Sequence, residues 1–203
     1  MGKLDVNKQK KRTSLLTTAF DLFTTQGINK TSISEIAGKA GVAKGTFYLY
    51  FKDKYDLRNK LISHKSSQLF GEAYAAMLKD TSIQSFDQKL LKIVDYIIDK
   101  LSKDKLLLSF ISKNLSWGIF KAALTTPAEE DGDINFYEVY LKMLNEEPLN
   151  FKNPEVMLFL IIELVGSTCY SSILYEEPLP IEELKPDLYE TIQAIIRNHT
   201  TSK

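Results

Sequence analysis

The run AGVAKGTFYLYF, residues 40–51, places a lysine, a threonine and two tyrosines within seven positions. A lysine near glycine and threonine occurs in nucleotide-binding phosphate loops. That motif, G-x-x-x-x-G-K-S/T, would need a glycine at position 43 after Gly38, and the chain has Ala43 there. The pattern therefore argues against a nucleotide cradle, and these polar side chains need another kind of element to position them.

A short helix over Lys44–Phe51 sorts these side chains by face. Phe47 and Phe51 are i,i+4 neighbours, so we expect them to share a buried face with Val42. Gly45 has no side chain, which lets the start of the helix approach a ligand closely. Lysine, threonine and tyrosine suit phosphate oxygens and base edges in a duplex. The outward side chains are then Lys44, Thr46, Tyr48 and Tyr50.

The elements around this helix have clear end signals. Ser32–Glu35 is a capping box that opens a short helix, and Gly41 ends it. Two short helices joined by a tight turn with glycine are typical of a helix-turn-helix. A longer helix over residues 8–26 precedes the pair and Gly27 follows it, while Asp53 opens a helix that runs to about Leu78.

The rest of the chain is helical by its apolar periodicity. The expected helices cover residues 83–101, 105–114, 115–124, 135–145, 155–175 and 181–198. We predict an all-α fold of about nine helices. It divides into an N-terminal domain that contains the helix-turn-helix, residues 1–65, and a C-terminal helical domain, residues 66–203.

The net charge of zero hides an uneven distribution. Residues 1–65 hold 13 Lys or Arg and 5 Asp or Glu, a balance of +8, and residues 66–203 have a balance of −8. Such asymmetry predicts that the N-terminal third meets a polyanion. The alternative is a chance scatter of solvated charges.

The stretch TSISEIAGKAGVAKGTFYLYFKDKYDL resembles the DNA-binding signature of the tetracycline-repressor (TetR) family of bacterial regulators. The resemblance covers residues 10–60. It implies three groups of DNA-binding residues. Thr46, Tyr48, Tyr50 and Lys54 would contact the duplex, Lys44 and Gly45 would lie at base-reading positions, and Thr31, Ser32 and Ser34 would contact the backbone. The chain departs from the family at Ala43, where a serine often caps the helix, so about 1 kcal/mol of capping is missing.

Two assignments in the basic third keep a structural alternative. Tyr50 contacts DNA or packs against the first helix. The basic string Lys8, Lys10, Lys11 and Arg12 is a solvated tail or an arm that reaches into a groove.

The resemblance implies a homodimer, and two apolar helices support it. Residues 155–175 are apolar nearly all round, and residues 181–198 carry an apolar stripe. We favour a dimer because a two-fold DNA site needs a two-fold protein. The alternative is that both helices complete the monomer core. The predicted interface residues are Val165, Gly166, Cys169, Leu188, Ile192, Ile195 and Ile196.

The resemblance also implies a small-molecule effector, with no cofactor. Aromatic residues between positions 86 and 143 suit an apolar pocket, although aromatic residues at helical spacing are more often ordinary core. The pocket candidates are Tyr96, Phe110, Trp117, Phe120 and Tyr140.

Other classes of protein fit the sequence poorly. The two histidines, His64 and His199, are too few for a metal cluster, and Cys169 lies in an apolar helix without a nearby histidine. We therefore expect no enzyme and no metal. Glu163 near the middle of the apolar run Val156–Tyr175 argues against a membrane span, and the polar N-terminus argues against a secretory signal.

These observations predict a cytoplasmic, homodimeric transcriptional regulator, more specifically a repressor that binds a palindromic operator and is released by its effector. Activation is the alternative within that class. From another class, the alternative is a helical ligand-binding or scaffolding protein whose helix-turn-helix contacts another protein.

Overall fold

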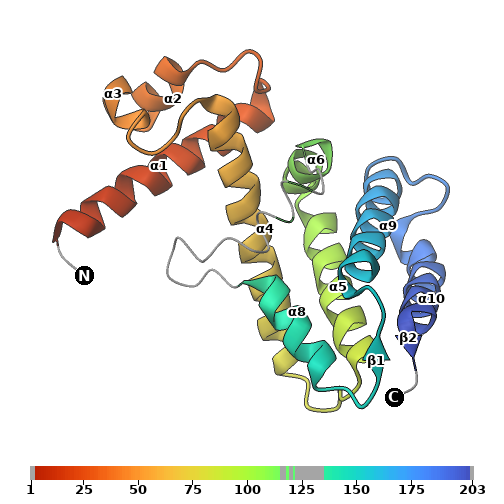
Figure 1. The fold of residues 1–203 in the computed structure, drawn as a ribbon. Coiled ribbons are helices and arrows are strands. Elements are labelled where there is room, and N and C mark those ends of the chain that lie inside the picture. The colour runs from red at the N-terminus through yellow and green to blue at the C-terminus, as the bar shows by residue number, and fades with distance from the viewer. Residues whose placement is uncertain (1–2, 115–117, 119–120, 122–134, 202–203) are drawn as a thin grey trace. The chain divides into compact units, whose positions relative to one another are not determined.

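A computed structural model describes residues 3–114, 118, 121 and 135–201 of the chain (Figure 1). The described part contains nine helices and two strands of two residues each. The predicted all-helical fold is confirmed. Of the helix predicted over residues 115–124, only residues 118 and 121 are described. The chain divides into an N-terminal unit, Met1–His64, and a C-terminal unit, Lys65–Lys203.

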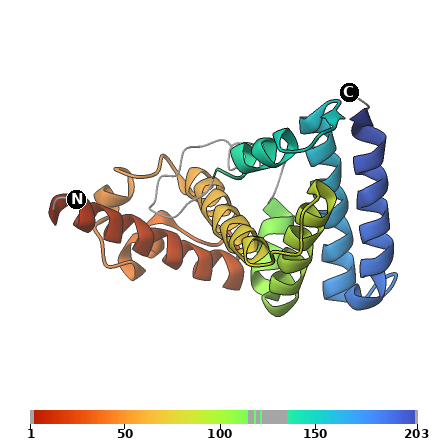
Figure 2. The same ribbon diagram turned by 90° about the horizontal axis from the view of Figure 1, so that it is seen from below.

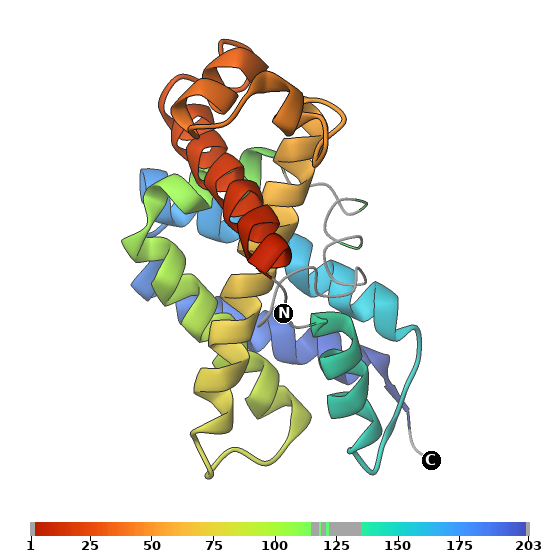
Figure 3. The same cartoon turned by 90° about the vertical axis from the view of Figure 1, so that its left-hand side faces the viewer.

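The N-terminal unit is built on the long helix α1, Lys3–Thr25, which begins earlier than its sequence pattern indicates. Helices α2, Ile33–Lys39, and α3, Lys44–Phe47, are short (Figure 3). Helix α4, Lys54–Leu78, begins in this unit. Apolar side chains of α1 are buried, as are residues of α2 and α4. This core contains Leu15, Leu16, Ala19, Leu22, Phe23, Ile36, Ala37, Leu57, Leu61 and Ile62.

The C-terminal unit contains the rest of α4 and five further described helices. They are α5, Phe86–Lys103; α6, Lys105–Asn114; α8, Phe136–Asn145; α9, Pro154–Tyr175; and α10, Ile181–His199. The short strands β1, Asn150–Phe151, and β2, Thr200–Thr201, pair antiparallel. The sequence pattern did not predict these strands, because two residues are too few to establish a period.

Helices α9 and α10 pack side by side (Figure 2). By length and composition α9 is the one helix in the described chain that could cross a membrane, and it packs against α5, α6 and α10. Four of the residues predicted to form a dimer interface are buried within the C-terminal unit. These are Cys169 on α9 and Leu188, Ile192 and Ile196 on α10, all at most 7% exposed. They are therefore core residues of the protomer and are not available to a partner.

The burial of Cys169 also bears on its chemistry. Burial raises the pKa of its thiol to about 12, so it stays protonated at neutral pH. A protonated, enclosed thiol is a poor nucleophile, which agrees with a packing role for this residue.

Candidate nucleic-acid interface

The turn between α2 and α3 is formed by residues whose types already indicate it in the sequence. Ser32 caps α2, its Oγ accepting a hydrogen bond from the Glu35 N–H at 3.1 Å. At the other end of α2, Gly41 has φ +70°. The N–H of Val42 donates to the Ala37 carbonyl at 3.0 Å, and the N–H of Gly41 donates to the Gly38 carbonyl at 3.2 Å. This is a Schellman motif, which reverses the chain and starts α3 beside α2.

Helix α3 is shorter than predicted. It spans Lys44–Phe47, and residues 48–50 form a turn in which the Leu49 N–H donates to the Thr46 carbonyl at 3.2 Å. Ala43 precedes the helix without a side-chain cap, as its residue type predicts. The short helix therefore ends before the two tyrosines, and the turn sets their directions.

Two phenylalanines fix this segment to the N-terminal unit. Phe47 is 0% exposed and Phe51 is 1% exposed, with their ring centroids 5.5 Å apart. Their predicted role as core anchors is confirmed. Because both rings are enclosed, the residues between them have a defined position on the surface.

The outward side chains form a mixed polar and apolar surface. Lys44, Gly45 and Tyr48 are exposed, with Tyr48 at 52%, while Thr46 and Tyr50 are half-buried. Leu49, which we did not select from the sequence, is 76% exposed. Its position two residues from each buried phenylalanine is the signal that could have identified it. We call Lys44, Gly45, Thr46, Tyr48 and Leu49 the recognition surface.

Tyr50 fits partly with each alternative given above. Its side chain is half-buried, its ring centroid lies 6.2 Å from that of Phe51, and its carbonyl accepts a hydrogen bond from Lys60 Nζ at 3.5 Å. Tyr50 thus packs on the core of the N-terminal unit along one side and meets solvent along the other.

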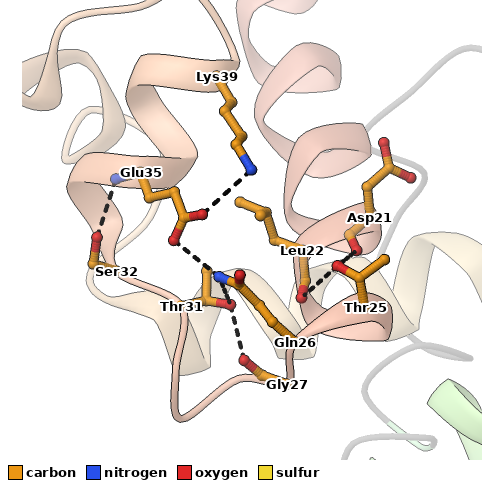
Figure 4. A network of polar contacts seen from close by, with 9 residues as sticks. All are labelled: Asp21, Leu22, Thr25, Gln26, Gly27, Thr31, Ser32, Glu35 and Lys39. Atoms are coloured by element: carbon orange, nitrogen blue, oxygen red, sulfur yellow. Dashed lines mark hydrogen bonds and ion pairs between the residues drawn. The ribbon is translucent and has the colours of Figure 1, made fainter.

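Thr31 is part of an internal network rather than of the surface (Figure 4). It is 2% exposed; its Oγ1 donates to the Gly27 carbonyl at 2.8 Å and accepts from Gln26 Nε2 at 3.3 Å. Gln26 also donates to Glu35, which pairs with Lys39 at 3.3 Å. The hydrogen bond from Gln26, assisted by Lys39, holds the pKa of Glu35 below its usual value. Ser32 and Ser34 are exposed, as a backbone contact requires.

Lys54 is likewise committed within the N-terminal unit. Its ammonium donates to the carbonyls of Ile28, Asn29 and Thr31 at 2.9, 3.3 and 3.2 Å. Asp53 caps α4, accepting from the N–H groups of Tyr55 and Asp56 at 2.7 and 2.8 Å. The three donors of the Lys54 ammonium therefore bind the turn after α1 instead of pointing to solvent.

The recognition surface has the chemistry needed to bind a duplex. A lysine offers charge to phosphates or to a guanine edge, a tyrosine hydroxyl binds phosphate oxygens, and a leucine can contact a thymine methyl group. Exposed lysines elsewhere in the unit add positive charge. They are Lys8, Lys10, Lys11, Lys30, Lys39 and Lys52.

The predicted pocket residues in the C-terminal unit mostly serve other purposes. Tyr140 is 0% exposed and its hydroxyl donates to the Pro154 carbonyl at 2.8 Å, and burial raises its pKa. The Tyr96 hydroxyl donates to Glu72 at 3.3 Å, and Phe110 is buried. Trp117 and Phe120 lie outside the described residues. Tyr140 is therefore a core residue whose hydroxyl is already hydrogen-bonded within the protein.

A different set of residues in this unit lines an apolar cavity. A cavity of about 100 Å³ lies among α4, α5, α6, α8 and α9. Val165 and Gly166, which we predicted at a dimer interface, line it. Ile195, also predicted there, is half-buried.

The N-terminal unit matches a known protein family. Residues 15–61 match the family described as "Bacterial regulatory proteins, tetR family". Among curated proteins, the probable acrEF/envCD operon repressor of Escherichia coli (strain K12) is 31% identical over 104 residues, 50% of this chain and 47% of that protein. The chain matches less than half the length of the curated relatives considered.

Solved structures share the fold over nearly the whole chain. A tetR family transcription regulator from Shewanella sp. PV-4 superposes with a TM-score of 0.63 at 20% identity, covering 94% of this chain and 98% of that one. The transcriptional regulator FadR from Bacillus subtilis, solved with stearoyl-CoA, has a TM-score of 0.63 at 18% identity, covering 89% and 96%. At these identities the likeness concerns the fold alone.

Proposed function

Because the chain belongs to the tetR family of bacterial transcriptional regulators, we propose that it is a repressor that binds a palindromic operator as a homodimer. A small-molecule effector bound in the C-terminal unit releases it from DNA. One observation supports DNA binding above the others: Tyr48 and Leu49 are exposed between two enclosed phenylalanines, Phe47 and Phe51, and Lys44 is exposed at the start of the same helix.

The recognition surface enters the major groove in this proposal. The start of α3 approaches the base edges, which Gly45 permits because it has no side chain. Lys44 and Tyr48 bind phosphates or base edges, and Ser32 and Ser34 hold the backbone from the start of α2. Lys54 supports this surface from within by binding the turn before α2.

A two-fold operator places its half-sites about 34–36 Å apart, one helical turn. We assign the dimer contact to the outer faces of α9 and α10, because their shared face is already filled. On α9, Val156 and Leu160 lie one turn apart and are 47% and 40% exposed. Ser167 is exposed on the same helix and is small, which suits a close crossing with a second copy.

The effector acts through a preference between two arrangements of the dimer. The related structure of FadR with stearoyl-CoA supports a ligand-binding role for the C-terminal unit. Helix α4 runs without a break from Lys54 to Leu78, so it joins the two units covalently. A ligand against its C-terminal half can therefore bias the spacing of the two recognition surfaces.

The remaining assignments follow from this role. The protein works in the cytoplasm, where its DNA is, and has no catalytic activity or membrane partner. Repression is favoured over activation because the Escherichia coli relative is named as a repressor.

The test is selection of duplexes from a random pool, followed by binding measurements on the selected duplex. Lys44→Ala, Tyr48→Ala and Leu49→Ala should each weaken binding, by about fivefold or more, because each removes a phosphate or base contact worth roughly 1–3 kcal/mol. The matched controls are Lys105→Ala and Tyr175→Ala, which change exposed residues of the C-terminal unit.

Affinity should also fall steeply with salt concentration, because bound phosphates release counterions. A different outcome is that the selection yields no duplex while random DNA binds weakly and independently of salt concentration. That outcome would favour a helix-turn-helix that contacts another protein. Equal affinities for the three variants and the unchanged protein would refute the proposed recognition surface.

A further inference from the structure

The cavity in the C-terminal unit has almost wholly apolar walls. Phe70 of α4 and Phe136 of α8 both line it and stack on each other, with centroids 4.3 Å apart and an interplanar angle of 25°. Ile93 and Val94 of α5 contribute a further wall and are at most 6% exposed. Such walls offer hydrophobic and dispersion contacts to an occupant and few polar ones.

Ser66 has the only polar side chain among the described residues that line the cavity. It lies on α4 and is 3% exposed. No hydrogen bond joins its hydroxyl to another described residue, although a buried hydroxyl normally has a partner. The hydroxyl is therefore free to bind a polar atom of an occupant.

Charge is absent from the described cavity lining. A carboxylate or ammonium group placed there would lose its hydration without gaining a counter-charge, which strongly disfavours its binding. A neutral polar group beside Ser66 would lose far less. The Ser66 hydroxyl can form one hydrogen bond with it, in place of a hydrogen bond that it makes to water in solution.

Building on the proposed function, we propose that the effector is a small uncharged molecule, mainly hydrocarbon, whose single hydrogen-bonding group meets the Ser66 hydroxyl. The cavity volume of about 100 Å³ limits the size of the buried part of the ligand. An apolar protein cavity of about 150 Å³ accommodates benzene, so the buried part of this ligand is of that size or slightly smaller.

Gly166 on α9 offers a way to close the cavity without a cost to the fold. It lines the cavity, its φ is not positive, and a Cβ added to it meets no atom within 4 Å. We choose leucine here because the added Cβ has open space and Gly166 lines the cavity, and because leucine replaces a poor helix former with a good one.

The experiment uses the full-length protein without DNA. It measures the binding of three probes that share a five-carbon chain and differ in charge. 1-Pentanol is neutral, pentanoate negative and pentylammonium positive, and calorimetry and the shift in unfolding temperature report binding. We expect 1-pentanol to bind at least about tenfold more tightly than either ion. Ser66→Ala should weaken 1-pentanol binding about two- to tenfold, and the neighbouring Ser67→Ala should leave it unchanged.

Gly166→Leu supplies the second readout. It should abolish the thermal shift given by 1-pentanol without lowering the unfolding temperature of the free protein. Equal or tighter binding of pentanoate, or 1-pentanol binding that survives Gly166→Leu, would overturn the proposal.

DNA binding is measured separately, on the selected duplex. Duplex binding with no affinity for 1-pentanol overturns the ligand class and leaves the DNA-binding function standing. If the protein binds 1-pentanol but selects no duplex, the proposed ligand site is supported and the proposed regulatory function is refuted.

Discussion

At the scale of single residues, Lys44 of the recognition surface and Lys54 at the start of α4 have different roles. Lys44 is exposed, whereas the Lys54 ammonium is bound by three backbone carbonyls of the turn after α1. Sequence alone treats both as cations available to phosphates. Their environments separate them, because a group whose donors are all used inside the protein has little left to offer a ligand.

Lys54→Met should therefore act on stability first. Losing charged hydrogen bonds to the turn should lower the free energy of unfolding by about 1–3 kcal/mol. Urea unfolding followed by circular dichroism measures this. Lys52→Met, at an exposed neighbouring position, serves as the control and should change stability little. Unchanged stability of Lys54→Met with weakened duplex binding would show that Lys54 contacts phosphate directly.

At the scale of elements, the helix-turn-helix depends on two glycines for different reasons. Gly41 has φ +70° in the turn, while a Cβ on Gly45 meets nothing within 4 Å. Gly41→Ala should cost about 1–2 kcal/mol of stability, because an L-residue is strained in the left-handed region. Gly45→Ala should leave stability equal or slightly higher, yet weaken duplex binding, since its methyl group lies where the helix approaches the base edges.

Thermal unfolding and binding to the selected duplex measure the pair of glycine variants together. Each variant is the control for the other. If Gly45→Ala bound the duplex as tightly as the unchanged protein, close approach at the start of α3 would be excluded.

A polar cluster joins α5 to α10. Lys185 Nζ lies 2.5 Å from Asp99 and 3.2 Å from Asp95, and the Tyr189 hydroxyl donates to Asp95 at 2.6 Å. Burial lowers the pKa of Lys185, but the hydrogen bonds that its ammonium donates to Asp99, Asp95 and Glu182 outweigh burial and raise that pKa above 10.5. Burial and Asp95 raise the pKa of Tyr189 above 10.0.

Both groups hold their protons more tightly in the folded state, so their contribution is complete below the unfolded pKa values and is lost as pH rises through the folded ones. The free energy of unfolding should thus fall as pH rises above 10.0, the lower of the two reference values. Lys185→Met should lower it by about 1–3 kcal/mol near neutral pH and flatten the alkaline decline. Lys105→Met is the control, and an identical alkaline decline in both variants would contradict the assignment.

At the scale of the whole molecule, the proposed dimer should depend on the outer face of α9. Leu160→Glu places a charge beside its copy across a two-fold contact, which should shift the protein toward monomer and weaken operator binding. Sedimentation equilibrium at micromolar concentration measures the shift. Leu106→Glu changes a leucine that is 59% exposed on α6 and should leave the mass unchanged. An unchanged protein that sediments as a monomer would refute the dimer itself.

The sequence by itself determined the features that depend on neighbours along the chain. Ser32 and Gly41 mark the ends of α2, and the i,i+4 spacing of Phe47 and Phe51 identifies the anchors of the recognition surface. Capping and positive φ are local properties of residue types, so they can be read without the fold.

Tertiary structure alone decided which apolar and polar side chains are enclosed, and by what. Cys169 and Ile192 suit a core and an interface equally by residue type, and only their burial in the folded C-terminal unit makes them core. Thr31 and Lys54 look like DNA contacts until their partners in the turn are known. The cavity beside Ser66 has no signature in the sequence, because its volume is what remains after five helices have packed.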